Sequence, residues 1–196
     1  VAILILSMLL LASSFEKIPL LSLRVGDRVG SIVGHLINPH SLHIDALWVK
    51  VGGFQEPHLL LPKDIRELTL QGAVIDDLDV VMHTDDAHRL KQIVELGYNL
   101  IDKKVISSGL KIGKVADYSI DHESFYVRKL YVTPTIWKAL QTNSLIIDRS
   151  QIIEVSHEYV RVKGTELPSE KILREGKKPQ PSFAPLPSAN TSSINE

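Results

Sequence analysis

The sequence predicts a mainly β protein, with two small β-barrels in tandem, a short α-helix joining them and a disordered C-terminal tail. Three observations support this fold class. The stretch from Gly30 to Val49 occurs again, without a gap, as Gly113 to Val132. Apolar and polar residues alternate in both copies, which is typical of β-strands. After residue 164 the chain becomes rich in proline and serine and poor in apolar residues, which indicates disorder.

The two copies agree in residue identity and in chemistry. Identical residues occupy Gly30/Gly113, Ile37/Ile120, Ser41/Ser124, Leu47/Leu130 and Val49/Val132. Similar residues occupy Ile32/Val115, Asn38/Asp121, Leu42/Phe125, Ile44/Val127 and Trp48/Tyr131. Such self-similarity at a fixed spacing indicates duplication. Because each half is small for a domain with its own core, we expect the halves to pack together.

Each copy is predicted to form a hairpin around a tight turn. Asn38-Pro39-His40-Ser41 suits a type I turn, and Asp121 to Ser124 matches it without the proline. In the second arm of each hairpin, apolar residues alternate along one face. Leu47 and Val49, like their counterparts in the second copy, make the other face partly apolar as well. Strands that are covered on both sides indicate a curled sheet or barrel.

Shorter segments downstream also match, now with four extra residues in the second copy. Leu59–Leu68 aligns with Ile146–Val155, and Ala73–Ile75 aligns with Val160–Val162. The insertion includes Thr133 to Leu140, where a capping residue followed by proline predicts one or two turns of helix.

The apolar start, Val1 to Phe15, is shorter than the roughly 20 residues of a membrane-spanning helix. It is therefore interpreted as a buried first strand of the first sheet, and if Met8 is the true start, Leu9-Leu10-Leu11 is that strand. Targeting or membrane anchoring through residues 1–15 is the alternative.

Between the copies, Thr84, Asp85 and Asp86 predict the cap and acidic first turn of a linker helix that ends at Gly97. The acid-rich segment from Asp76 to Asp86 lacks the spacing of a calcium loop. The predicted organisation is a first barrel at 1–82, a linker helix at 83–98, a second barrel at 99–164 and a disordered tail at 165–196.

Composition limits the function. The net charge is −1, the pI is about 6.8 and neither half has a basic block, so direct nucleic-acid binding is disfavoured. The absence of cysteine excludes disulfides, thiolate metal sites and cysteine nucleophiles. It also fits a reducing compartment, and we expect the cytoplasm.

For each group of candidate site residues, a purely structural role is the alternative to a functional one. His35, His40 and His43 flank one hairpin and suggest zinc, but no third ligand can be assigned, and Tyr118 and Tyr126 replace two of them in the second copy. Isolated carboxylates are expected in surface ion pairs, and large aromatic residues in the core or an interface rather than as a base-stacking platform. The carboxylates are Asp64, Glu67 and Glu154, and the aromatic residues are Trp48, Tyr131 and Trp137.

Glycines at 26, 30 and 34 lack the spacing of a phosphate-binding loop and are interpreted as turn and bulge residues. We therefore expect no catalytic, cofactor-binding or metal-binding residues and no cofactor.

The order of these elements resembles the PRC-barrel domain, twice over. The resemblance rests on a glycine-bracketed first strand, a hairpin ending in Leu47-Trp48-Val49 or Leu130-Tyr131-Val132, and the short strands after it. PRC-barrels occur in one subunit of the photosynthetic reaction centre and in the ribosome maturation factor for the small ribosomal subunit. The resemblance covers about residues 9 to 163 and implies a protein-interaction module without catalytic residues. This chain differs from both proteins. The maturation factor has a different domain before its barrel, where this chain has a second PRC-like copy, and the reaction-centre protein has a full membrane helix, whereas the apolar start of this chain is shorter.

The sequence thus favours a non-enzymatic cytoplasmic adaptor that binds a protein partner of unknown identity. A ribosome-assembly or RNA-processing factor is one alternative, and a membrane-associated scaffold is another.

Overall fold

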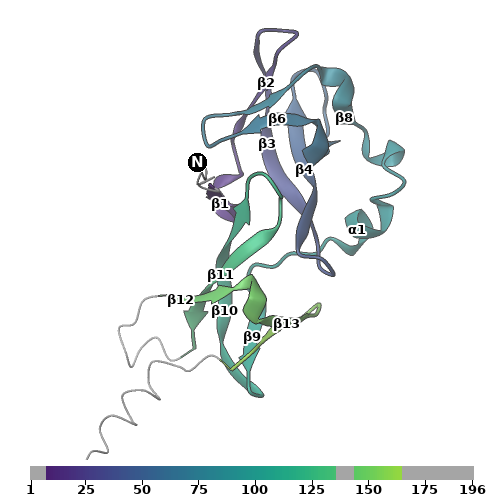
Figure 1. Cartoon of the computed structure of the whole chain (residues 1–196). Helices are drawn as coiled ribbons and strands as arrows, with labels where there is room; N and C mark the ends of the chain where they lie inside the picture. The colour runs from purple at the N-terminus through teal and green to yellow at the C-terminus, as the bar shows by residue number, and fades with distance from the viewer. Residues whose placement is uncertain (1–7, 136–143, 165–196) are drawn as a thin grey trace, which may run out of the picture. The chain divides into compact units, whose positions relative to one another are not determined.

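The computed structural model describes residues 8–135 and 144–164, and they form two seven-stranded sheets (Figure 1). The first sheet has the order β6-β7-β2-β3-β4-β5-β8, and the second has the order β13-β14-β9-β10-β11-β12 with β1 beside β10. The pairs β2–β7 and β9–β14 are parallel, and the other pairs in the described residues are antiparallel. The predicted fold class is confirmed.

The first sheet consists of β2 (Pro19–Ser22), β3 (Asp27–Asn38), β4 (His43–Val51), β5 (His58–Leu60), β6 (Ile65–Leu68), β7 (Ala73–Ile75) and β8 (Val81–Met82). The second consists of β1 (Leu9–Leu11), β9 (Lys104–Ser107), β10 (Leu110–Asp121), β11 (Val127–Pro134), β12 (Leu145–Asp148), β13 (Ile152–Val155) and β14 (Tyr159–Val162). The helical elements are η1 (Ala12–Ser14), η2 (Pro62–Asp64), η3 (Leu78–Val80), η4 (Thr84–Asp86), α1 (Lys91–Leu96) and η5 (Arg149–Gln151).

The duplication extends to irregular details. β3 has irregular register after Ile32 and after Leu36, and β10 has it at the equivalent points after Val115 and after Ser119. The short helices η2 and η5 connect equivalent strands. The two matched hairpins therefore occupy equivalent places in two sheets that share the topology of six strands and differ in the seventh, β8 or β1.

Both hairpins close in the same way. The Leu42 N–H donates to the Asn38 carbonyl at 2.8 Å, and the Phe125 N–H donates to the Asp121 carbonyl at 2.8 Å. Leu42 and Phe125 adopt left-handed φ values of 52° and 55°. Each loop is one residue longer than the type I turn predicted from the sequence, because this left-handed residue comes between the turn and the returning strand.

Glycine is required where the strands of each hairpin approach most closely. A Cβ atom on Gly30 would lie 2.3 Å from the Lys50 carbonyl oxygen, and one on Gly113 would lie 2.3 Å from that of Thr133. Any side chain at these positions would collide with the neighbouring backbone. The glycine at the start of both repeats is therefore explained by strand packing.

The interiors of both sheets are apolar. Equivalent side chains are completely buried at Ile32/Val115, Leu47/Leu130, Val49/Val132 and Leu60/Ile147. The outer face of the first sheet is also covered. There, Leu36, Ala46 and Leu59 pack with Ala87 of the linker, and residues of α1 lie against them.

The linker helix is shorter than predicted. The chain forms η4 at Thr84–Asp86, turns at Ala87 and begins α1 only at Lys91. Ala87 has a non-helical ψ of 52° and its side chain is buried in the cluster on the first sheet, so packing interrupts the helix there. The predicted end is confirmed, because Gly97 caps α1 in the left-handed conformation.

The N-terminal strand belongs to the other sheet from the one predicted. Leu9, Leu10 and Leu11 pair with Asp121, Ile120 and Ser119 of β10, in the second sheet (Figure 1). β1 precedes the first copy in the chain but pairs with the second. Conversely, α1 precedes the second copy and packs on the first.

Three expectations concern residues outside the described ranges: residues 1–7, most of the predicted helix in Thr133–Leu140 with Trp137, and the tail at 165–196. Among the described residues, no helix has both the length and the apolar character needed to cross a membrane.

The pairing of β1 with the second sheet can be tested at Leu10, whose side chain is 2% exposed, whereas Leu9 and Leu11 are about 40% exposed. We expect Leu10→Ala to lower the free energy of unfolding by about 2–4 kcal/mol, because it removes a buried side chain and leaves a cavity. Urea unfolding measures the change. Leu9→Ala and Leu11→Ala are matched controls that should each cost much less, and equal losses in all three variants would contradict the burial of Leu10.

Candidate functional site at the junction of the two copies

The two hairpin ends meet through a pair of reciprocal backbone hydrogen bonds. The Ile44 N–H donates to the Phe125 carbonyl at 2.9 Å, and the Val127 N–H donates to the Leu42 carbonyl at 2.9 Å. Leu42 is equivalent to Phe125, and Ile44 is equivalent to Val127. Each copy thus offers the same two groups to the other, as in the isologous interface of a two-fold dimer.

Two histidines lie at this junction, and each faces its own equivalent in the other copy. His35 shares a hydrogen bond with the hydroxyl of Tyr118, and the ring centroids are 5.7 Å apart. His43 packs its ring against Tyr126, with the centroids 4.7 Å apart. Phe15 completes the buried side of the junction by contacting His35.

Burial determines the protonation state of His35. Desolvation lowers the pKa of His35 to about 4, while the nearby charge of Asp117 opposes the change. Burial also raises the pKa of Tyr118. At neutral pH a neutral imidazole and a neutral phenol therefore share this hydrogen bond, and the tautomer of the imidazole decides which of them donates.

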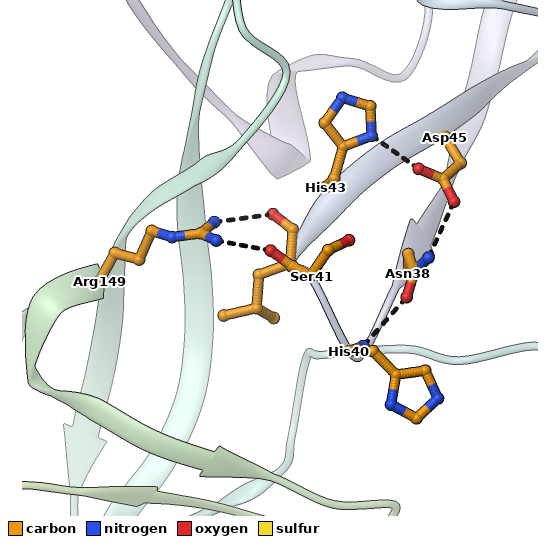
Figure 2. Close-up of polar contacts among 7 residues, drawn as sticks. Asn38, His40, Ser41, His43, Asp45 and Arg149 are labelled. Atoms are coloured by element: carbon orange, nitrogen blue, oxygen red, sulfur yellow. Dashed lines mark hydrogen bonds and ion pairs between the residues drawn. The ribbon is translucent and has the colours of Figure 1, made fainter.

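A polar network surrounds the first turn (Figure 2). His43 Nδ1 lies 2.6 Å from Asp45, whose second oxygen accepts a hydrogen bond from the Asn38 amide at 3.1 Å. The Asn38 side-chain oxygen in turn accepts from the His40 backbone N–H at 3.0 Å. This network fixes the conformation of the turn that presents Leu42 to the second copy.

The second copy uses different chemistry at the same places. Asp121 stands where the first copy has Asn38, and Arg128 stands where it has Asp45. Asp121 accepts from the backbone N–H groups of Glu123 and Ser124 and lies 3.4 Å from Arg128. A cross-strand polar pair thus supports both turns.

Arg149 of η5 connects the second copy to the first turn. Its guanidinium donates to the carbonyls of Ser41 at 2.6 Å and Leu42 at 3.3 Å (Figure 2). It also lies over the Tyr126 ring, 4.6 Å from the ring centroid. The equivalent residue in the first copy is Pro62, which has no donor. The contact is therefore made from one side only.

A surface hollow of about 270 Å³ lies beside Arg149, with His40 and Glu154 among its lining residues. A histidine oriented by a carboxylate, as in His43–Asp45, also occurs in hydrolase triads. In the described residues, however, the ring of Tyr126 rather than a serine hydroxyl packs against this imidazole. The arrangement is best suited to holding the two copies together.

The other sequence candidates are dispersed. His35 and His43 do not face each other across the hairpin, since they lie opposite Leu47 and Asn38. Within residues 8–135 and 144–164, no three histidine or acidic side chains are grouped to hold a metal ion. Asp64 lies in η2 and Glu67 is exposed on β6.

Several carboxylates form surface ion pairs. Glu154 pairs with Arg161 at 3.1 Å and accepts from the Tyr159 hydroxyl at 3.0 Å. In the acid-rich segment, Asp76 and Asp77 pair with Arg66 and Arg24, and hydrogen bonds from these arginines lower the pKa of both carboxyl groups. These acids therefore tie the end of β7 to β6 and to the turn between β2 and β3.

Sequence reasoning missed the contacts that join the copies. The alignment of the copies makes Tyr118 and Tyr126 replacements of His35 and His43, whereas the structure makes them their partners. The alignment of each histidine with a tyrosine was the sequence signal that could have indicated these contacts. No such signal pointed to Arg149, whose role depends on the approach of two segments far apart in the chain.

Comparisons with known proteins identify no family. No protein-family model matches the chain, and it matches no curated protein.

Removing the Arg149 contact should weaken the junction. We expect Arg149→Ala to lower the free energy of unfolding by about 1–3 kcal/mol, because charge-assisted hydrogen bonds to two carbonyls and the ring contact are lost. Arg161→Ala, which removes a surface pair, is the control and should cost less than about 1 kcal/mol. Equal effects in urea unfolding would show that Arg149 is an ordinary surface arginine.

His35 should make stability depend on pH. The unfolded imidazole takes up a proton near pH 6.5 and the folded one only near pH 4, so acid favours the unfolded chain between these values. We expect this group to cost about 3 kcal/mol of stability as pH falls from 6.5 to 4, with no further loss below that range.

The check compares urea unfolding at several pH values for the natural protein, His35→Leu and Tyr118→Phe. The first variant should lose this part of the pH dependence. The second should keep most of it, because burial is the main cause of the low pKa. An unchanged pH profile in His35→Leu would refute the assignment.

Proposed function

We propose that the chain is a non-enzymatic adaptor of the PRC-barrel type, which binds a protein partner in the cytoplasm. The twin sheets, filled by equivalent apolar side chains, support the PRC-barrel interpretation. The buried His–Tyr pair and Arg149 make contacts within the protein, which suits a structural role better than turnover.

The observation that carries the proposal is an uncovered strand edge in the second copy. In the first sheet, β8 pairs with the outer side of β5 through Leu59↔Met82 and Leu60↔Val81. In the second sheet, β12 is the equivalent strand, and no strand covers its outer side within the residues that the structure describes. Ile146 on β12 is 54% exposed.

An open edge with an exposed apolar side chain is suited to receiving an extended segment of another protein. The partner's backbone would pair with β12, and its side chains would contact Ile146. The first copy shows that this position of the fold accepts an added strand, because β8 occupies it there.

The test is affinity capture from native cells with the full chain and two variants. Ile146→Lys places a charge on the open edge and should reduce the captured partner at least about tenfold. Leu110→Lys is the matched control: Leu110 is 68% exposed and lies on β10 before its pairing with β11 begins, so capture should be unchanged.

Equal capture by both variants would exclude the β12 edge. Comigration of the natural protein with ribosomal particles at moderate salt would favour the ribosome-assembly alternative instead.

A further inference from the structure

A hollow of about 440 Å³ lies on the outer face of the first sheet, apart from the junction and from β12. Trp48 of β4, Val33 of β3, Thr84 of η4, and Glu56 and Pro57 of the β4–β5 loop line it. Its volume falls within the usual range of small-ligand sites. Thr84, near the start of the linker, forms part of its wall, so the hollow adjoins the linker.

The tryptophan in this hollow is held in place from behind. Trp48 packs against the cluster of Leu36, Ala46, Leu59 and Ala87. A Cβ atom built on Gly34 would lie 3.6 Å from Trp48 Cδ1, so the indole lies close to the Gly34 backbone. One part of the indole is thus fixed by the core, while another lines the hollow.

The part of the wall formed by the β4–β5 loop is also anchored. The Glu56 carbonyl accepts a hydrogen bond from His58 Nδ1 at 2.9 Å, and Pro57 restricts the backbone between these residues. The buried His58 ring packs against Phe54 at 4.4 Å and against His83, the neighbour of Thr84, at 5.4 Å. Ring contacts therefore tie the loop that carries Glu56 to the segment that carries Thr84.

The charge of the hollow favours a cation. Glu56 is the only ionisable side chain among the five described residues that line it. Asp85 and Asp86 follow Thr84, and Lys50, on the same face of β4 as Trp48, does not line the hollow. A neutral guest would shield the Glu56 carboxylate from water without offering it a partner, whereas a cation would pair with it.

We propose that this hollow binds the guanidinium group of an arginine side chain in a partner protein. A guanidinium is planar and weakly hydrated, so it can stack on the Trp48 indole and pair with the Glu56 carboxylate at the same time. An ammonium group is more strongly hydrated and cannot stack in this way. This arginine site lies on the first copy, whereas the proposed partner edge, β12, lies on the second. Partner binding through β12 therefore does not depend on the arginine site.

The test uses the full chain and N-acetyl-arginine amide as the probe, with the backbone amide signals of Val33 and Thr84 followed by NMR. We expect saturable shifts with a dissociation constant on the order of millimolar, as suits a single side chain. The citrulline analogue, a neutral isostere, should bind at least about fivefold more weakly, and so should the lysine analogue.

Variants separate the two contacts. Glu56→Gln should weaken binding of the arginine probe about fivefold, and Trp48→Leu should abolish the saturable shifts while the spectrum stays dispersed. Two controls should leave binding unchanged. Glu67→Gln makes the same charge change on exposed β6, and Tyr131→Ala alters the residue equivalent to Trp48 in the second copy.

Equal binding of the arginine, lysine and citrulline probes would overturn the proposal, and so would unchanged binding by Glu56→Gln. Because these variants leave Ile146 in place, partner capture through β12 can succeed or fail independently of this result.

Discussion

The junction of the two copies depends on a reciprocal pair of hydrogen bonds accepted by two left-handed residues, Leu42 and Phe125. In each hairpin, the residue whose N–H closes the loop also gives its carbonyl to the other copy: Leu42 accepts from Val127, and Phe125 accepts from Ile44. A positive φ costs a non-glycine residue on the order of 1 kcal/mol. Burial of both side chains, at 5% and 6% exposure, offsets that cost. The same two residues therefore close the turns and join the copies.

A contact between equivalent positions explains why the copies differ where they meet. If both copies carried histidine at the positions of His35 and Tyr118, two buried imidazoles would face each other. In the structure a histidine and a tyrosine share one hydrogen bond at this buried site. The same holds around the turns, where Asn38 with Asp45 in one copy corresponds to Asp121 with Arg128 in the other. The two copies thus share one backbone arrangement, and the side chains that differ between them form the polar contacts where the copies meet.

The two copies are unequal because the segment that precedes each copy in the chain packs on the other copy. β1 pairs with the second sheet, while the linker with α1 covers the outer face of the first sheet. β8 then closes the edge of the first sheet at β5, whereas β12 stays open in the described part of the second. Two copies of one fold thus present different surfaces: a hollow beside the linker on one, and a strand edge on the other. This inequality is the basis for proposing two chemically different partner sites on one chain.

The strands, the hairpins and the duplication could be predicted from the sequence, because each depends on residues close together in the chain. Alternation along one strand, a turn residue at its end and a repeated glycine all act locally, as does the left-handed cap at Gly97. The sheet that Leu9–Leu11 would join, the break of the linker helix at Ala87 and the role of Arg149 could not be predicted in this way. Each depends on a surface formed by distant residues. Leu10 and Ala87 are placed by what they bury against, and Arg149 by carbonyls more than a hundred residues earlier in the chain. No local pattern carries that information, so only the packing of the two copies decided it.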